Sequence, residues 1–211
     1  WRQAYRMPKE AKRNRDEAGG VDLDALRALN PQCVGYISIK DTPLSYPVMQ
    51  TDEEGGMFYL THAFDRSYHG NGTPFLDMRC DIEKPSDNLI VYGHNTRNTK
   101  MFSCLRFYQE REYFEEHPIV RFDHENGGDY QIFAVLFSSL SEQENRDIFR
   151  MIERDPEEPE QWEKFLEYLA RHSLYDTGVK AETEDRILTL STCYRPIDNG
   201  RVLVFAKKIE N

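Results

Sequence analysis

The sequence predicts a mainly β fold with helical additions, arranged as a closed barrel or a sandwich. Eight strand-like runs follow one another along the 211 residues, with few parallel crossovers between them. Two of these runs are joined at Asn126-Gly127-Gly128, which is a strong hairpin signal. A chain of this length is within the range of one β-rich domain that buries most of its apolar surface.

The predicted strands are short runs of apolar residues, many of them β-branched or aromatic. In chain order they cover residues 34–40, 44–49, 73–77, 88–93, 119–123, 130–138, 186–193 and 201–208. In the seventh run Ile187, Thr189, Ser191 and Cys193 share one face, because successive side chains of a strand point to opposite sides.

Three helical segments complete the prediction. Residues 22–29 form a short helix that ends at Asn30-Pro31. A second helix spans 100–108 and continues toward Phe114, and a third spans 160–172. The third carries an apolar stripe at helical spacing that we expect to face the barrel, formed by Trp162, Phe165, Leu166 and Leu169.

The first 20 residues are basic, whereas the chain as a whole is acidic. Residues 1–20 hold six basic and three acidic side chains, a net +3, whereas the whole chain has a net charge of −10. We therefore predict a basic, helical, membrane-proximal segment at 1–30 and one β-barrel domain at 31–211. A solvated helix face is the alternative reading of the basic segment. The overall acidity argues against a nucleic-acid partner, which needs a basic footprint.

Three chemically useful side chains stand at the ends of predicted strands. Cys193 ends one strand, and Arg201 opens the next after a turn-forming stretch that contains Pro196 and Gly200. Direct pairing of the two strands places Cys193 and Arg201 within reach of one substrate carbonyl. His94 follows the apolar run 89–92 and Gly93, but its distance from the hairpin depends on tertiary structure.

This trio supplies what acyl transfer requires. A thiolate attacks an acyl carbon, an imidazole protonates the leaving amine, and a guanidinium stabilises the oxygen that becomes negative. We therefore identify Cys193, His94 and Arg201 as the candidate catalytic residues.

The remaining cysteines and histidines favour structural roles. Cys33, Cys80 and Cys104 show no metal-ligand or redox spacing, so we expect small buried residues, with a disulfide among them as an open alternative. We expect no metal and no cofactor. Five other histidines are expected at the surface, namely His62, His69, His117, His124 and His172.

Several stretches resemble one enzyme family. Thr189-Leu190-Ser191-Thr192-Cys193 with Arg201 downstream, and Tyr92-Gly93-His94-Asn95 upstream, resemble the sortase signature. Residues 30–50, 72–79 (Gly-Thr-Pro-Phe-Leu-Asp-Met-Arg) and 88–105 are similar to class B sortases in particular. The resemblance covers most of the chain from about Asn30 onward, and it implies an eight-stranded sortase-type barrel with N-terminal helices and a long helix before the cysteine strand.

The resemblance also implies a function. A class B sortase of Gram-positive bacteria cleaves a sorting signal after Thr, through a thioacyl intermediate on Cys193, and transfers the protein to an amine of the peptidoglycan cross-bridge. The signal would resemble Asn-Pro-x-Thr-Asn or Asn/Ser-Pro-x-Thr-Gly, and Ser191, Thr192 and Tyr92 would border the groove that binds it. The expected partners are surface proteins that carry this signal and a peptidoglycan precursor. The expected location is the extracellular face of the membrane, held by an N-terminal anchor that this sequence, which starts at Trp1, does not contain.

Two other functions use the same residues differently. A cysteine hydrolase would employ this trio with water as the acceptor, although the Cys-Gly-x-Cys-Trp context of papain-like enzymes is absent. A non-catalytic cell-surface binding module would keep Cys193 as a structural thiol.

Overall fold

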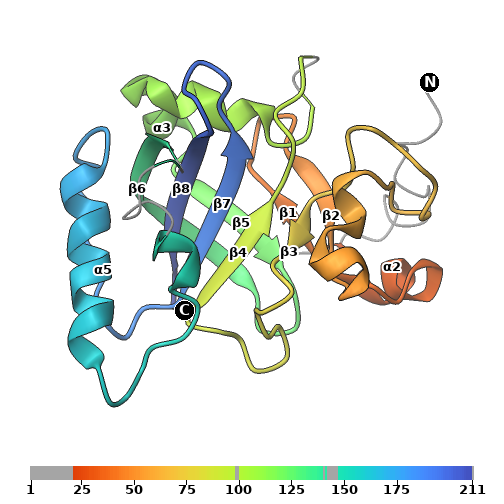
Figure 1. Cartoon of the computed structure of the whole chain (residues 1–211), viewed down its shortest axis with the longest axis horizontal. Coiled ribbons are helices and arrows are strands. Elements are labelled where there is room, and N and C mark those ends of the chain that lie inside the picture. The colour runs from red at the N-terminus through yellow and green to blue at the C-terminus, as the bar shows by residue number, and fades with distance from the viewer. Residues whose placement is uncertain (1–20, 98–99, 140, 142–146, 211) are drawn as a thin grey trace.

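Eight strands close into a barrel in the computed structural model of the protein (Figure 1). The structure describes residues 21–97, 100–139, 141 and 147–210. All eight predicted strands are present, and each begins and ends within two residues of its predicted bounds. They are β1 (Cys33–Ser38), β2 (Ser45–Met49), β3 (Phe75–Leu76), β4 (Asn88–Tyr92), β5 (Ile119–Asp123), β6 (Gly128–Ser139), β7 (Ile187–Cys193) and β8 (Gly200–Lys208).

The strand order around the barrel is β1-β2-β3-β4-β7-β8-β6-β5. Most neighbours are antiparallel, including the β5–β6 hairpin predicted from Asn126-Gly127-Gly128. Two pairs are parallel, β2 with β3 and β4 with β7. The β4–β7 pair matters most for the site, because it brings the end of β4 beside the end of β7 although about a hundred residues separate them in the chain.

Successive side chains of a strand point to opposite faces, so the apolar residues of one strand are divided between the main core and a second cluster. In β7 and β8 the even-numbered residues Leu188, Leu190 and Val204 belong to the main core. The odd-numbered residues Ile187 and Leu203 join a second cluster with helix α5 (Pro159–His172). The predicted stripe of α5 is confirmed, since its four residues are buried there, and the helix stands alongside β6 and β8 in Figure 1.

One short helix precedes the first strand, and the others occupy connections between strands. Helix α2 (Leu23–Leu29) begins after Asp22, whose carboxylate caps it by accepting from the Ala25 amide at 2.9 Å. One-turn 3-10 helices follow at η1 (Glu53–Gly56) and η2 (Phe58–Leu60), and another, η4 (Ile148–Arg150), lies between β6 and α5.

The helix predicted from residue 100 toward Phe114 is wrong in its type and continuity. The chain instead forms the 3-10 helix η3 (Ser103–Gln109), an extended residue at Glu110, and then the α-helix α3 (Arg111–Glu116). The Tyr108 carbonyl accepts a hydrogen bond from the Tyr175 hydroxyl at 2.9 Å, so a distant side chain occupies an acceptor that helices use internally. Tertiary contacts therefore override the local helical pattern.

The division into 1–30 and 31–211 stays a prediction. Residues 1–20, which carry the basic charge, lie outside the described residues. No helix in the described part of the chain is long and apolar enough to cross a membrane.

Candidate active site

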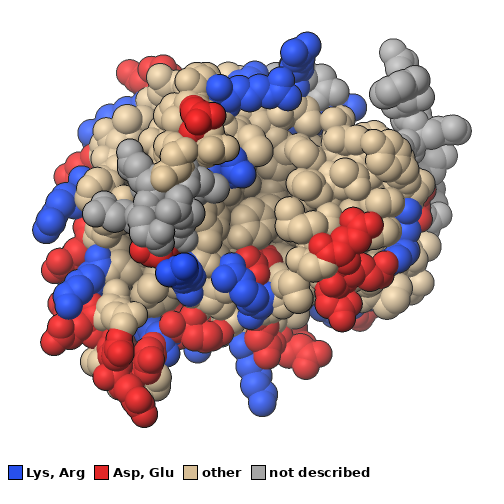
Figure 2. Space-filling view, viewed as in Figure 1, with Lys and Arg blue, Asp and Glu red and all other residues tan. Residues whose placement is uncertain are grey.

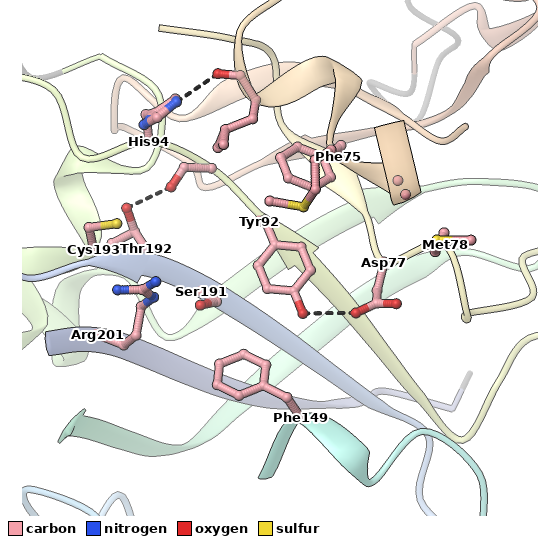
Figure 3. Close-up of a pocket in the computed structure, with 15 residues that line it drawn as sticks. Phe75, Asp77, Met78, Tyr92, His94, Phe149, Ser191, Thr192, Cys193 and Arg201 are labelled. Atoms are coloured by element: carbon pink, nitrogen blue, oxygen red, sulfur yellow. Dashed lines mark hydrogen bonds between the residues drawn. The ribbon is translucent and has the colours of Figure 1, made fainter. Parts of the chain in front are cut away.

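A pocket of about 420 Å³ lies at the ends of β4 and β7. All six residues singled out from the sequence line it, namely Tyr92, His94, Ser191, Thr192, Cys193 and Arg201. Figure 2 shows a hollow near the centre of this face, floored mainly by uncharged residues. In Figure 3, His94, Cys193 and Arg201 lie at one end of the pocket, which we call the reactive end, while Tyr92, Asp77 and Phe149 lie at the other, the far end.

The β7–β8 hairpin places the thiol beside the guanidinium. Cys193 and Arg201 are direct register partners in this antiparallel pair. Gly200 closes the connecting loop, because a Cβ at this position would lie 2.4 Å from the Tyr194 carbonyl oxygen. The pairing predicted from the sequence is confirmed.

His94 is carried to the same end by the parallel pair β4–β7. Tyr92 is in register with Ser191, so His94 leaves β4 at the level where Cys193 ends β7. Gly93 permits this path, since a Cβ there would lie 2.5 Å from the Phe102 ring.

Hydrogen bonds attach the His94 segment to β7. The Gly93 amide donates to the Ser191 carbonyl at 3.1 Å, and the Thr192 hydroxyl donates to the Gly93 carbonyl at 2.6 Å. The Asn95 side-chain amide donates to the Cys193 carbonyl at 2.9 Å. Three consecutive residues of β7 thus hold the residues that precede and follow His94.

The orientation of the imidazole follows from its own hydrogen bond. His94 Nε2 lies 2.7 Å from the Leu60 carbonyl oxygen. A carbonyl only accepts, so Nε2 carries a proton and donates it. Nδ1 is therefore the ring nitrogen left to exchange a proton in the pocket.

Exposure distinguishes the four thiols. Cys193 is exposed, whereas Cys33, Cys80 and Cys104 are buried, as expected, and all four are free thiols. Burial raises the pKa of Cys33 and Cys80 to about 12 and that of Cys104 to about 11. These three remain protonated near neutral pH and unreactive, so Cys193 is the thiol available for chemistry.

The far end of the pocket was not identified from the sequence. Its walls come from Gly55 to Met57, from Phe75, Asp77 and Met78, and from Phe149. Glu54, Gly55 and Gly56 all have positive φ, between 53° and 83°, and turn the chain so that Met57 reaches the rim. In the sequence, Glu54-Gly55-Gly56 indicates only a turn. No local pattern indicates that Phe149 lies close to β4.

Two further observations concern a histidine and the ligands that a metal ion would need. His124 is buried rather than at the surface, because it packs beside Phe122 and Tyr130 where β5 meets β6. Among the described residues no cluster of three or more His, Cys, Asp or Glu side chains has the geometry to hold a metal ion.

Comparisons with known proteins agree with this architecture. The sortase domain model matches residues 37–209. Sortase B of Staphylococcus aureus is 31% identical over 190 residues, covering 89% of this chain and 75% of that protein. Sortase B of Listeria monocytogenes is 32% identical over 193 residues, covering 89% and 74%. The X-ray structure of Clostridium perfringens sortase B superposes with a TM-score of 0.77 at 29% identity, covering 89% of this chain and 99% of that one.

A closed eight-stranded barrel with a thiol, an imidazole and a guanidinium at one pocket fits these matches, and the chain belongs to the sortase family, whose members are cysteine transpeptidases. Its relatives and structural neighbours place it among the class B enzymes, which sort proteins to the cell wall. The non-catalytic binding module is therefore set aside.

Proposed function

We propose that this chain cleaves a C-terminal sorting signal of the Asn-Pro-x-Thr-Asn or Asn/Ser-Pro-x-Thr-Gly kind after Thr and transfers the new carboxyl group to an amine of the peptidoglycan cross-bridge. The observation that carries the proposal is the register pairing of Cys193 with Arg201, at the pocket that His94 also lines. One substrate carbonyl placed there meets a nucleophile, a proton donor and a cation.

Cys193 is the nucleophile. Its sulfur attacks the Thr carbonyl carbon, the peptide bond to the next residue breaks, and a thioester joins Thr to the enzyme. The exposure of Cys193 at the end of β7 supports this role, because a peptide can reach the sulfur without rearrangement of the barrel.

His94 transfers the protons. Nδ1 gives a proton to the departing amine and later takes one from the incoming amine. The Leu60 carbonyl supports this role because it holds the Nε2 proton in place and stabilises the positive ring.

Arg201 stabilises the negative oxygen of each tetrahedral intermediate. Among the described residues its guanidinium makes one recorded hydrogen bond, from Nη1 to the Gly200 carbonyl at 3.0 Å. Other donors of its planar fork are therefore available to a substrate oxygen.

Ser191, Thr192 and Tyr92 border the bound peptide. The Ser191 hydroxyl is buried without a partner among the described residues, so it suits a peptide polar group that enters the pocket. The Thr192 hydroxyl is already bonded to the Gly93 carbonyl, so Thr192 offers the peptide only its methyl group. Its hydroxyl holds the His94 segment in place. Tyr92 presents its ring, since its hydroxyl donates to Asp77 at 2.8 Å.

Related structures support the expected partners. Solved structures of class B enzymes include a Staphylococcus aureus sortase B–substrate complex and a sortase B complexed with a triglycine peptide. We infer that this chain likewise takes a sorting-signal peptide and an amine acceptor. We also place it at the extracellular face of the membrane and expect no nucleic-acid partner.

Mass spectrometry of the products tests the proposal. The chain and a Cys193→Ala variant are incubated with peptides of both signal types, with and without a glycine-peptide amine. Cleavage after Thr and a Thr–amine adduct that both require Cys193 are expected. If water is the only acceptor with every amine supplied, the chain is instead a hydrolase. If no peptide gives a product that depends on Cys193, the proposal is overturned.

A further inference from the structure

The far end of the pocket is organised around one carboxylate. Asp77 directly follows β3 and is only 7% exposed. Its two oxygens accept four hydrogen bonds: from the Arg79 amide at 3.0 Å, Arg79 Nε at 2.9 Å, Arg79 Nη2 at 2.7 Å and the Tyr92 hydroxyl at 2.8 Å. Its acceptor sites are thus occupied by the protein itself, so it is not a free charge for a ligand.

The charge state of this group is fixed by the same contacts. Burial acts to raise the pKa of Asp77, but the hydrogen bonds from Arg79 and Tyr92 outweigh it and hold that pKa below its usual value. Burial, with the negative charge of Asp77, raises the pKa of Tyr92, so the phenol keeps its proton and remains a donor.

Arg79 extends the network across the pocket. Its Nη2 also donates to the Phe149 carbonyl at 2.8 Å, a contact that spans 70 residues of sequence. Half of the Arg79 side chain is exposed, so the guanidinium bridges the barrel and the η4 turn at the surface.

The two aromatic rings of the far end depend on this bridge. The Phe149 ring stacks near the Tyr92 ring, with centroids 6.1 Å apart and planes 22° apart, and Tyr92 packs on Phe75 at 5.4 Å. Figure 3 shows Phe149 and Tyr92 side by side opposite the reactive end. Phe149 lies in a three-residue turn, so few bonds within the turn itself fix its ring.

We propose that Asp77 and Arg79 are positioning residues that clamp Phe149 and Tyr92 into one rigid wall of the peptide-binding pocket. Asp77 holds the Tyr92 hydroxyl with one oxygen and the Arg79 fork with both, and Arg79 holds the Phe149 backbone. The inference rests on the proposed function, since the wall binds the part of the sorting signal that precedes the cleaved bond. The clamp acts on binding and not on the bond-breaking step, because it lies away from Cys193.

Two variants of Arg79 test the clamp. Arg79→Ala removes the bridge, and Arg79→Lys keeps the charge beside Asp77 but lacks the forked donors. The matched control is Arg150→Ala, which removes an equal charge from the η4 turn itself, where Arg150 is exposed and pairs with Asp147 at 3.0 Å. We expect KM for a cleaved sorting peptide to rise about tenfold in Arg79→Ala and at least threefold in Arg79→Lys, with kcat within about twofold of wild type. Arg150→Ala should change neither.

Hydrogen exchange supplies a readout that does not need activity. The amides of Met151 and Ile152 donate to the Ile148 and Arg150 carbonyls at 3.3 and 3.0 Å, so they report on the η4 turn. Their exchange should accelerate in both Arg79 variants and not in Arg150→Ala.

Three outcomes would overturn the clamp: unchanged exchange at η4, an unchanged KM in folded Arg79→Lys, or a fall in kcat as large as the rise in KM. If the wild-type chain cleaves no peptide, the proposed function fails, and the exchange comparison alone decides whether Arg79 fixes the turn.

Discussion

The two ends of the pocket use hydrogen bonds in opposite ways. At the far end, one carboxylate accepts four bonds, and the arginine that it holds donates to a backbone carbonyl 70 residues away. At the reactive end, within the described residues, the side chains of His94 and Arg201 each make one hydrogen bond, and in both cases the acceptor is a backbone carbonyl. The difference indicates that binding surfaces are made rigid by saturating their polar groups, whereas reacting groups are oriented but left with donors to spare.

The backbone around the reactive end makes this freedom possible. The His94 segment is held to β7 by Gly93, Thr192 and Asn95, so the imidazole needs few bonds of its own. Rigidity is supplied one residue away from the chemistry.

The largest expected effect comes from Arg201→Lys at the reactive end. Lysine keeps the charge but loses the planar fork, so we expect kcat/KM for peptide cleavage to fall by about 10²–10³-fold. Arg195→Lys, on an exposed arginine of the loop that joins β7 to β8, is the matched control and should stay near wild type. Near wild-type turnover in Arg201→Lys would remove the guanidinium from the mechanism.

The second prediction concerns the stability of the fold at acid pH and a buried histidine, His124, that does not line the pocket. Burial, with the positive charges of Lys208 and Arg27, lowers the pKa of His124 to about 4, from 6.5. The folded state therefore disfavours protonation, and stability present above pH 6.5 should be lost as the pH falls toward 4, by up to about 3 kcal/mol. Urea unfolding at several pH values measures this.

The matched variant for that measurement is His124→Phe, which cannot titrate. Its unfolding free energy should depend less on pH between 6.5 and 4 than that of the wild type. Equal slopes in the two proteins would show that other groups set the acid sensitivity.

Thr192→Val tests whether the rigid attachment behind His94 matters. The substitution keeps the shape but leaves the Gly93 carbonyl without its donor, which costs about 1–2 kcal/mol of stability. We expect kcat/KM to fall about tenfold through displacement of the imidazole, while Thr192→Ser, which retains the hydroxyl, stays closer to wild type. Similar activity in Thr192→Val and the wild type would mean that the other two bonds suffice.

The smallest expected effect belongs to Asn95→Ala. Its bond to the Cys193 carbonyl is exposed and competes with water, so its loss should lower kcat/KM only about two- to threefold. A loss as large as that of Arg201→Lys would show that the Asn95 side chain takes part in the chemistry itself.

The local sequence pattern is enough to predict the strands and the pairing of two site residues, Cys193 and Arg201. The β7–β8 hairpin is contiguous in sequence, so the pairing of Cys193 with Arg201 follows from strand ends and a short turn. The buried stripe of α5 likewise follows from its period alone.

The rest depended on contacts between distant segments. Parallel pairing of β4 with β7 leaves no mark in either strand, so the place of His94 beside Cys193 was not visible. The contact of Arg79 with the Phe149 carbonyl spans 70 residues and involves a backbone atom, which no residue pattern encodes. His124 was misassigned for the same reason, because the rings that bury it belong to two strands.

The most direct test of the account is the intact mass of the protein after brief incubation with a sorting peptide and rapid acid quenching. A thioacyl enzyme predicts a mass increase equal to the peptide fragment that ends in Thr, located on Cys193, removed by hydroxylamine and absent from Cys193→Ala. Cleavage of the peptide that persists in Cys193→Ala, or that proceeds without any such adduct on the wild-type chain under single-turnover conditions, would contradict it.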